Sequence, residues 1–162
     1  MTTLVVMPLA TLGHELGHAL LALRAVPGPV IVHVGRPPAW IELDWPRLKI
    51  RWSPLPARGV PFAGLCVWRG SLASPRAKVA VYLAGPLVTA LQIPVFLALL
   101  ALCREMADWI PATWGLSALV AFIGVLFNLD PRTSAEANAA HGAIRRDGPQ
   151  ALAAYRVWRA SS

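Results

Sequence analysis

Three long apolar segments, residues 4–23, 79–103 and 110–129, most constrain what this chain can fold into. A helix needs about 20 mostly apolar residues to cross the hydrocarbon core of a bilayer. The second and third segments contain no charged residue, and the first carries only a short cluster of titratable side chains. Charged residues make up only 14% of the chain, whereas soluble domains carry about 25%. We therefore predict an α-helical membrane protein with three transmembrane helices.

Residues 28–72, between the first two apolar segments, have the pattern of short β-strands. Runs of β-branched or alternating residues are interrupted by prolines, which is typical of strands separated by turns. The four runs are residues 30–35, 40–45, 48–52 and 60–68. We predict a small β-element here, and one of its edges is a candidate for capturing an extended peptide by strand addition. A loop with some strand character and no such role is the alternative.

These segments divide the chain into a membrane core, residues 1–131, and a helical tail, residues 132–162. Residues 133–146 have the pattern of a helix, and the Asp-Gly-Pro run after them is typical of a helix stop. Residues 151–159 predict a second tail helix, with aromatic side chains suited to the membrane interface. A solvated helix is the alternative for that last segment.

The distribution of basic residues predicts the orientation of the chain. Residues 24–78 hold nine Lys or Arg and two acids, residues 104–108 hold one Arg and two acids, and the tail holds five Arg. Because cytoplasmic loops carry the excess of Lys and Arg, we expect the β-element and the tail in the cytoplasm of a bacterium and the N-terminus outside its plasma membrane. Nucleic acid is not an expected partner, because the net charge of +7 flanks apolar segments and no nucleic-acid motif appears.

The first apolar segment contains the motif HELGH, from His14 to His18. On a helix, residues four apart lie on one face about one turn from each other, so the two imidazoles can bind one metal ion. Glu15 lies on a neighbouring face, where it can take a proton from a water molecule beside the metal. Gly13 and Gly17 keep the helix surface slim, so that another helix or a substrate can approach closely.

The titratable cluster in the first apolar segment could also have a role other than metal binding. A charged group at the centre of a bilayer costs about 2.5–3.5 kcal/mol on insertion scales, so a cluster without a function is disfavoured there. A proton relay or ion pathway is the rival, but the other two apolar segments offer no carboxylate or histidine to extend it. Cys66 and Cys103 lack the spacing of metal ligands or of a disulfide framework.

The chain resembles the site-2 protease family of intramembrane zinc metallopeptidases, of the M50 type. The resemblance rests on the HELGH segment, on Ala84-Gly85-Pro86 in the second apolar segment, and on the Asn-Leu-x-Pro pattern of residues 128–131. Residues 55–68 also resemble the family's Pro- and Gly-bearing strand. These features cover most of residues 4–131 in the family's order and imply a three-helix site-2-protease-like core. The family often has an asparagine where this chain has Thr89.

The resemblance implies roles for individual residues. His14 and His18 would bind Zn²⁺, Glu15 would act as the general acid and base, and Asn128 would help to hold the substrate backbone. The substrate would be a membrane protein or peptide in the lipid bilayer.

A third metal ligand is also implied, namely an aspartate in an Asp-Gly pair that follows the Asn-Leu-x-Pro pattern. The only Asp-Gly pair is Asp147 with Gly148, farther from that pattern than is usual in the family. Asp147 is therefore the first candidate, and Asp130, which precedes a proline, is the alternative. His141 in the tail is a further titratable residue that we expect on a helix surface.

Together these observations predict a zinc metalloendopeptidase that hydrolyses peptide bonds of membrane-associated substrates. The alternative is a pseudoprotease that binds zinc and acts as a membrane interaction protein without cleaving, because the third ligand departs from the family pattern.

Overall fold

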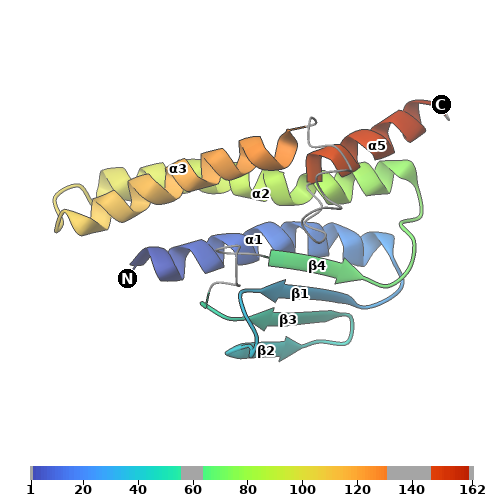
Figure 1. Ribbon diagram of the computed structural model, residues 1–162, viewed down its shortest axis with the longest axis horizontal. Helices are drawn as coiled ribbons and strands as arrows, with labels where there is room; N and C mark the ends of the chain where they lie inside the picture. The colour runs from blue at the N-terminus through green and yellow to red at the C-terminus, as the bar shows by residue number, and fades with distance from the viewer. Residues whose placement is uncertain (1, 56–63, 131–146, 161–162) are drawn as a thin grey trace.

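The computed structural model describes residues 2–55, 64–130 and 147–160 (Figure 1). The described part is mostly helical with one small sheet. Its elements in chain order are α1 (Thr2–Ala25), β1 (Val30–Val34), β2 (Ile41–Asp44), β3 (Leu48–Trp52), β4 (Gly64–Trp68), α2 (Pro75–Leu102), α3 (Trp109–Leu129) and α5 (Asp147–Ala160).

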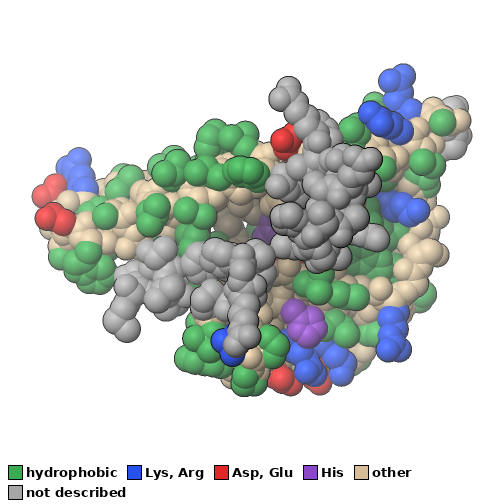
Figure 2. Space-filling model, in the orientation of Figure 1, with side chains coloured by type: hydrophobic (Ala, Val, Ile, Leu, Met, Phe, Trp, Pro, Cys, Tyr) green, Lys and Arg blue, Asp and Glu red, His purple; other side chains and the backbone are tan. Residues whose placement is uncertain are grey.

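The helices α2 and α3 are long and apolar enough to cross a membrane. Only 17% of the most apolar stretch of α2 and 22% of that of α3 is buried, whereas the core helix of a soluble protein would be mostly enclosed. Figure 2 shows hydrophobic side chains along this α2–α3 half of the molecule. Two of the three predicted spans therefore meet this criterion, and the predicted span of residues 4–23 stays a prediction, although α1 is helical there.

Small residues let α3 approach its neighbours closely. The buried residues of α3 are Thr113, Ser117, Ala118 and Ala121, which recur at intervals of three to four along one helix face. The rings of Phe96 on α2 and Trp114 on α3 stack beside this contact. Contacts between small side chains are typical of helix pairs in membranes, where the hydrophobic effect does not drive association.

The four predicted strands form one sheet with the order β2-β3-β1-β4. The strand β1 pairs in parallel with β3 and antiparallel with β4, and β2 pairs antiparallel with β3. The prediction of a small β-element between the first two helices is confirmed. Residues 56–63, which include the start of the fourth predicted strand, lie outside the described residues.

The helix α1 lies between the sheet and α2 (Figure 1). Its face toward the sheet carries Ala19 and Ala22, which form one buried cluster with Val26, just after the helix, and with Val30 and Val32 of β1. These valines alternate with more exposed residues along β1, because successive side chains of a strand point to opposite faces. Among the described side chains of α1 the exposed large hydrophobic ones are Leu9 and Leu20, whereas such side chains recur along the whole of α3.

The helix α5 runs along the first part of α2 (Figure 1). Gly148, Ala151 and Ala154 form its buried face, and the guanidinium of Arg76 lies 4.7 Å from the ring centre of Trp158. The predicted helix of residues 151–159 is thus confirmed. The Asp-Gly-Pro run, which we expected to stop a helix of residues 133–146, instead forms the first turn of α5; residues 131–146, including His141, lie outside the described residues.

Candidate metal centre

The helix α1 presents His14 and His18 one turn apart on the face toward α2. Their Nε2 atoms lie 3.2 Å from each other, and the two rings meet edge to face. This is the arrangement that the spacing of four predicts, because it depends only on local helix geometry.

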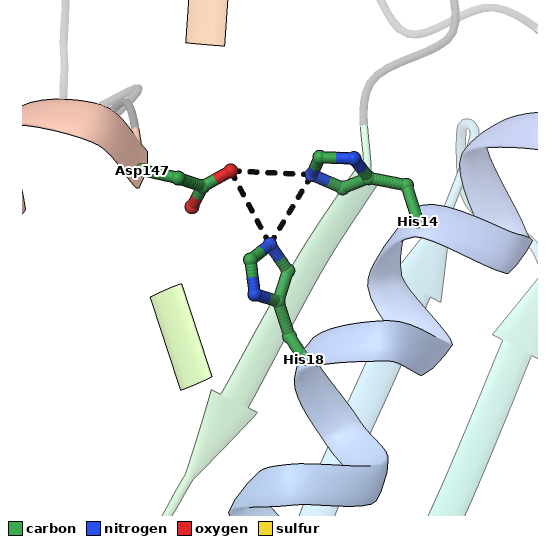
Figure 3. A group of neighbouring side chains, drawn as sticks. All are labelled: His14, His18 and Asp147. Atoms are coloured by element: carbon green, nitrogen blue, oxygen red, sulfur yellow. Dashed lines mark hydrogen bonds and ion pairs between the residues drawn. The ribbon is translucent and has the colours of Figure 1, made fainter. Parts of the chain in front are cut away.

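A third group reaches the histidines from the far end of the chain. The Oδ2 atom of Asp147 lies 3.2 Å from His14 Nε2 and 3.3 Å from His18 Nε2. Figure 3 shows the three side chains pointing toward one another from α1 and α5. Within the described part of the chain, these three residues bring one ligand atom each close enough together to hold one metal ion.

The spacing of these three atoms fits a tetrahedral zinc site. Ligands placed tetrahedrally at about 2.0–2.1 Å from zinc lie about 3.3 Å from one another, and the three distances here are 3.2, 3.2 and 3.3 Å. Three protein ligands also match the pattern of catalytic zinc sites, which keep a fourth position open.

The outer nitrogen of each imidazole is held by a hydrogen bond. His18 Nδ1 donates to the carbonyl oxygen of Val81 at 2.6 Å. His14 Nδ1 lies 2.7 Å from Thr89 Oγ1, whose own proton is donated to the carbonyl oxygen of Gly85. Since Nδ1 carries the proton in each neutral ring, both Nε2 atoms present a lone pair to the same point. Facing lone pairs beside a carboxylate favour a cation between them, and such outer bonds are typical of metal-binding histidines.

Gly85 allows α2 to pass directly over the imidazoles. A side-chain carbon at this position would collide with the Nε2 atoms of both His14 and His18. Directly beside this contact, Gly17 on α1 packs against the carbonyl oxygen of Ala84. The Ala-Gly-Pro sequence therefore has a steric reason in this chain, since any residue larger than glycine would push the histidines out of place.

Glu15 is buried beside the three-residue group, with 8% of its surface exposed. It interacts electrostatically with both histidines and Asp147, and accepts a backbone hydrogen bond from Cys66. Its carboxylate packs so closely on Gly64 that a side chain there would collide with it. The edge strand β4 thus lies directly beside the carboxylate that we predict to move the proton.

Two groups outside the helices α1 to α3 have shifted pKa values. Burial alone would raise the pKa of the Asp147 carboxyl, but the neighbouring imidazoles of His14 and His18 outweigh burial and lower it. Asp147 is therefore held as a carboxylate, the form that binds a metal. Burial, together with the charges of Glu15 and Asp147, raises the pKa of the Cys66 thiol to about 12, and Cys66 is not part of the three-residue group.

The other predicted site residues lie near the end of α3. Asp130 follows α3 as its C-cap residue and is not part of the three-residue group, so the geometry favours Asp147 over this alternative. The backbone of Asn128 lies against Gly148, next to Asp147. Asn128 is thus close to the site, as predicted, while its role toward a substrate stays a prediction.

Three contributions were missed at the sequence level. They are the carbonyl of Val81, the steric role of Gly85, and the hydrogen bond that His14 donates to Thr89. Thr89 looked like a departure from the family pattern, yet its hydroxyl orients a histidine. Gly85 and Thr89 are four residues apart, which places them on one helix face. This spacing is the sequence feature from which their shared contact with the histidines could have been predicted.

The helices α1 and α2 share one further polar contact close to the site. Gln92 Nε2 donates to the carbonyl oxygen of Ala10 at 3.1 Å, and its amide also contacts the position of Gly13. This bond crosses between the two helices one turn beyond Thr89, and it therefore helps to fix α2 against the helix that carries the histidines.

No protein-family model, curated protein or solved structure matches this chain.

Proposed function

We propose that this chain is an intramembrane zinc metallopeptidase, as its resemblance to site-2 proteases implies. One observation carries the proposal: His14, His18 and Asp147 converge with the spacing of a zinc site, and the buried carboxylate of Glu15 lies beside them. A metal centre with a proton-accepting group at its side is what hydrolysis of a peptide bond requires.

Different residues of the protein would bind the metal and transfer the proton. His14, His18 and Asp147 would hold Zn²⁺, which when bound polarises a carbonyl and makes water more acidic. Glu15 would take the proton of the attacking water and deliver it to the nitrogen of the leaving amine. Its burial supports this role, because a carboxylate shielded from bulk water exchanges its proton with the nearest reacting group.

The edge strand β4 is well placed to hold a substrate in extended form. One side of β4 pairs with β1, and no other described strand pairs with its other side. A peptide bound there would gain main-chain hydrogen bonds, and it would pass Glu15 because Gly64 of β4 packs on that carboxylate. An extended backbone also exposes the scissile bond, which a helix shields.

The proposed placement in the membrane follows the charge pattern. The start of α2, the sheet and α5 would lie on the cytoplasmic side of a bacterial plasma membrane, with the N-terminus outside. Exposed ion pairs between the edge strand β2 and its neighbour β3 support the contact of the sheet with water, because Lys49 pairs with Asp44 and Arg51 pairs with Glu42.

The decisive experiment measures metal content and cleavage in one detergent preparation. We would compare the wild type with Glu15→Gln, using a reporter that carries one transmembrane segment between two tags. The wild type should hold about one zinc per chain and cleave the reporter, since three protein ligands define one site. Glu15→Gln should keep the zinc and lose at least about 100-fold of the cleavage rate, the contribution expected of a general base.

Two outcomes would overturn the proposal in different ways. If no sample holds zinc after metal reconstitution, the metallopeptidase assignment is wrong. If the wild type holds zinc but Glu15→Gln cleaves at the same rate as the wild type, the cut comes from a contaminating protease. Zinc without any cleavage in either protein would favour the zinc-binding pseudoprotease instead.

A further inference from the structure

A groove of about 280 Å³ separates the first two turns of α2 from α5, away from the metal centre. Residues at intervals of three and four from each helix line it, so that one face of α2 opposes one face of α5. Its polar lining comes from Lys78, Tyr82 and Gln150, and its apolar lining includes Pro75, Ala153 and Val157.

The charge around this groove is positive. Arg76 and Lys78 belong to the start of α2, and Arg156 and Arg159 belong to the end of α5. Asp147 is the single acidic residue of these two helices, and it pairs with the histidines at the opposite end of α5. Figure 2 shows Lys and Arg side chains gathered at the end of the molecule where α5 ends.

The groove also lies where a membrane surface is expected. The helix α2 carries no charged residue after Lys78. Trp158, which stacks under Arg76, and Tyr155, which meets Trp158 edge to face, are the aromatic residues of α5. Tryptophan and tyrosine favour the level of the lipid headgroups. The side chain of Val157 is 59% exposed, which would be unfavourable in water but not against an acyl chain.

We propose that this groove binds an anionic phospholipid. Lys78 would pair with the phosphate, and an acyl chain would lie on Pro75, Ala153 and Val157. Basic pockets between helices on the cytoplasmic side of a membrane are suited to acidic headgroups. The combination of a cation with apolar walls distinguishes a lipid from a soluble phosphate, which would gain nothing from the alanine and valine.

A lipid in this position would touch both helices at once. Because α5 begins at Asp147, the lipid would favour the docked position of the helix that supplies the third member of the metal group. The lipid site itself is independent of peptidase activity, since its lining shares no residue with the metal centre.

The test is a lipid titration of the purified full chain in neutral detergent, read by native mass spectrometry. We would compare dioleoyl phosphatidylglycerol with dioleoyl phosphatidylcholine, and use glycerol phosphate as the headgroup without acyl chains. The wild type should bind phosphatidylglycerol at least about fivefold more tightly than phosphatidylcholine. This is the gain in affinity expected from the attraction between one lysine and one anionic headgroup.

Two variants and two matched controls locate the site. Lys78→Gln should remove most of the preference for phosphatidylglycerol, and Ala153→Phe should weaken both lipids by filling the groove. Arg159→Gln also removes a positive charge, and Ala160→Phe adds the same ring as Ala153→Phe, both at residues of α5 that do not line the groove. They should alter affinity by less than about twofold. Circular dichroism on each variant confirms that the helices are intact, and a second filling variant, Val157→Trp, replaces Ala153→Phe if that protein misfolds.

Three results would overturn the proposal. Equal binding of the two lipids would show that the groove does not select an anion. An equal effect of Arg159→Gln and Lys78→Gln would show diffuse attraction instead of a site. Glycerol phosphate binding as tightly as phosphatidylglycerol would identify a soluble anion as the occupant.

Discussion

The helices α1 and α3 are of similar length and both are rich in leucine, yet they are used in opposite ways. The outward face of α3 is apolar, with Leu119 53% exposed and Leu126 56% exposed, while its inward face is built from small residues. On α1, His14, Glu15 and His18 are buried or partly buried, where the sheet and α2 cover them. The contrast separates a helix whose surface would suit lipid from a helix whose enclosed face holds the candidate metal centre.

The difference follows from what covers each helix. A polar group in contact with lipid has no partner and is costly, so a helix that carries histidines and a glutamate needs other elements around it. The sheet and α2 provide that cover for α1, and they supply hydrogen-bond partners such as Val81 and Thr89. The exposed side chains of α3 are mostly apolar, so α3 would need no such cover if it crosses the membrane as predicted.

The largest expected effect is on zinc affinity, and it distinguishes the two candidates for the third metal ligand. Asp147→Ala should weaken zinc binding by about 10³-fold, since apparent affinities of about 10–16 kcal/mol are shared among a few ligands. Asp130→Ala, at the end of α3, should leave zinc binding unchanged. Competition with a fluorescent chelator measures both proteins. Loss of zinc in Asp130→Ala with retention in Asp147→Ala would reverse the assignment.

The next largest effect tests whether α1 and α3 both cross the membrane. Leu119→Arg puts a charge at the middle of α3 and should reduce insertion by about 100-fold, the equivalent of about 2.5–3.5 kcal/mol. Leu9→Arg, on the exposed surface of α1, should reduce insertion in the same direction but less, because it lies closer to a helix end. A glycosylation-based insertion assay reads both. Insertion of Leu9→Arg equal to the wild type would contradict the predicted span of residues 4–23.

A smaller effect tests the polar support that α1 receives from α2. Thr89→Val keeps the shape of the side chain but removes the hydroxyl beside His14 Nδ1, and it should weaken zinc binding by about 10-fold to 100-fold. Thr113→Val makes the same change on α3, where the hydroxyl bonds only its own helix. The same chelator competition should find wild-type affinity in Thr113→Val. Equal affinities of the two variants would mean that Thr89 does not orient the histidine.

The smallest effect concerns the docking of α5. Arg76 and Trp158 form a cation–π contact at the end of α5 distant from Asp147, and such contacts contribute about 0.5–1 kcal/mol at exposed sites. Trp158→Ala should therefore weaken zinc binding only about twofold to fivefold, through a less firmly docked α5. In a double-mutant cycle, Arg76→Gln should add little to Trp158→Ala. Full additivity would show that the two residues act separately.

Much of the local structure was predictable. His14 and His18 lie side by side because they are four residues apart on a helix. The three β-branched or alternating runs at residues 30–52 became β1, β2 and β3 because their patterns are local. The helical tail was predicted, but its Asp-Gly-Pro run was interpreted as a stop. Gly148 instead lets α5 begin tightly against the backbone of Asn128 and Leu129, a contact that no local pattern reveals.

The sequence by itself determined which elements form and which titratable residues share the face of α1, because helix and strand periodicity depend on neighbours within a few residues. Only the tertiary structure decided that Asp147, and not Asp130, meets the histidines, that β4 is the sheet edge beside Glu15, and that α2 crosses them at Gly85. These contacts join residues 49 to 133 positions apart, and their geometry is fixed by how whole helices and strands pack, which no short stretch of sequence specifies.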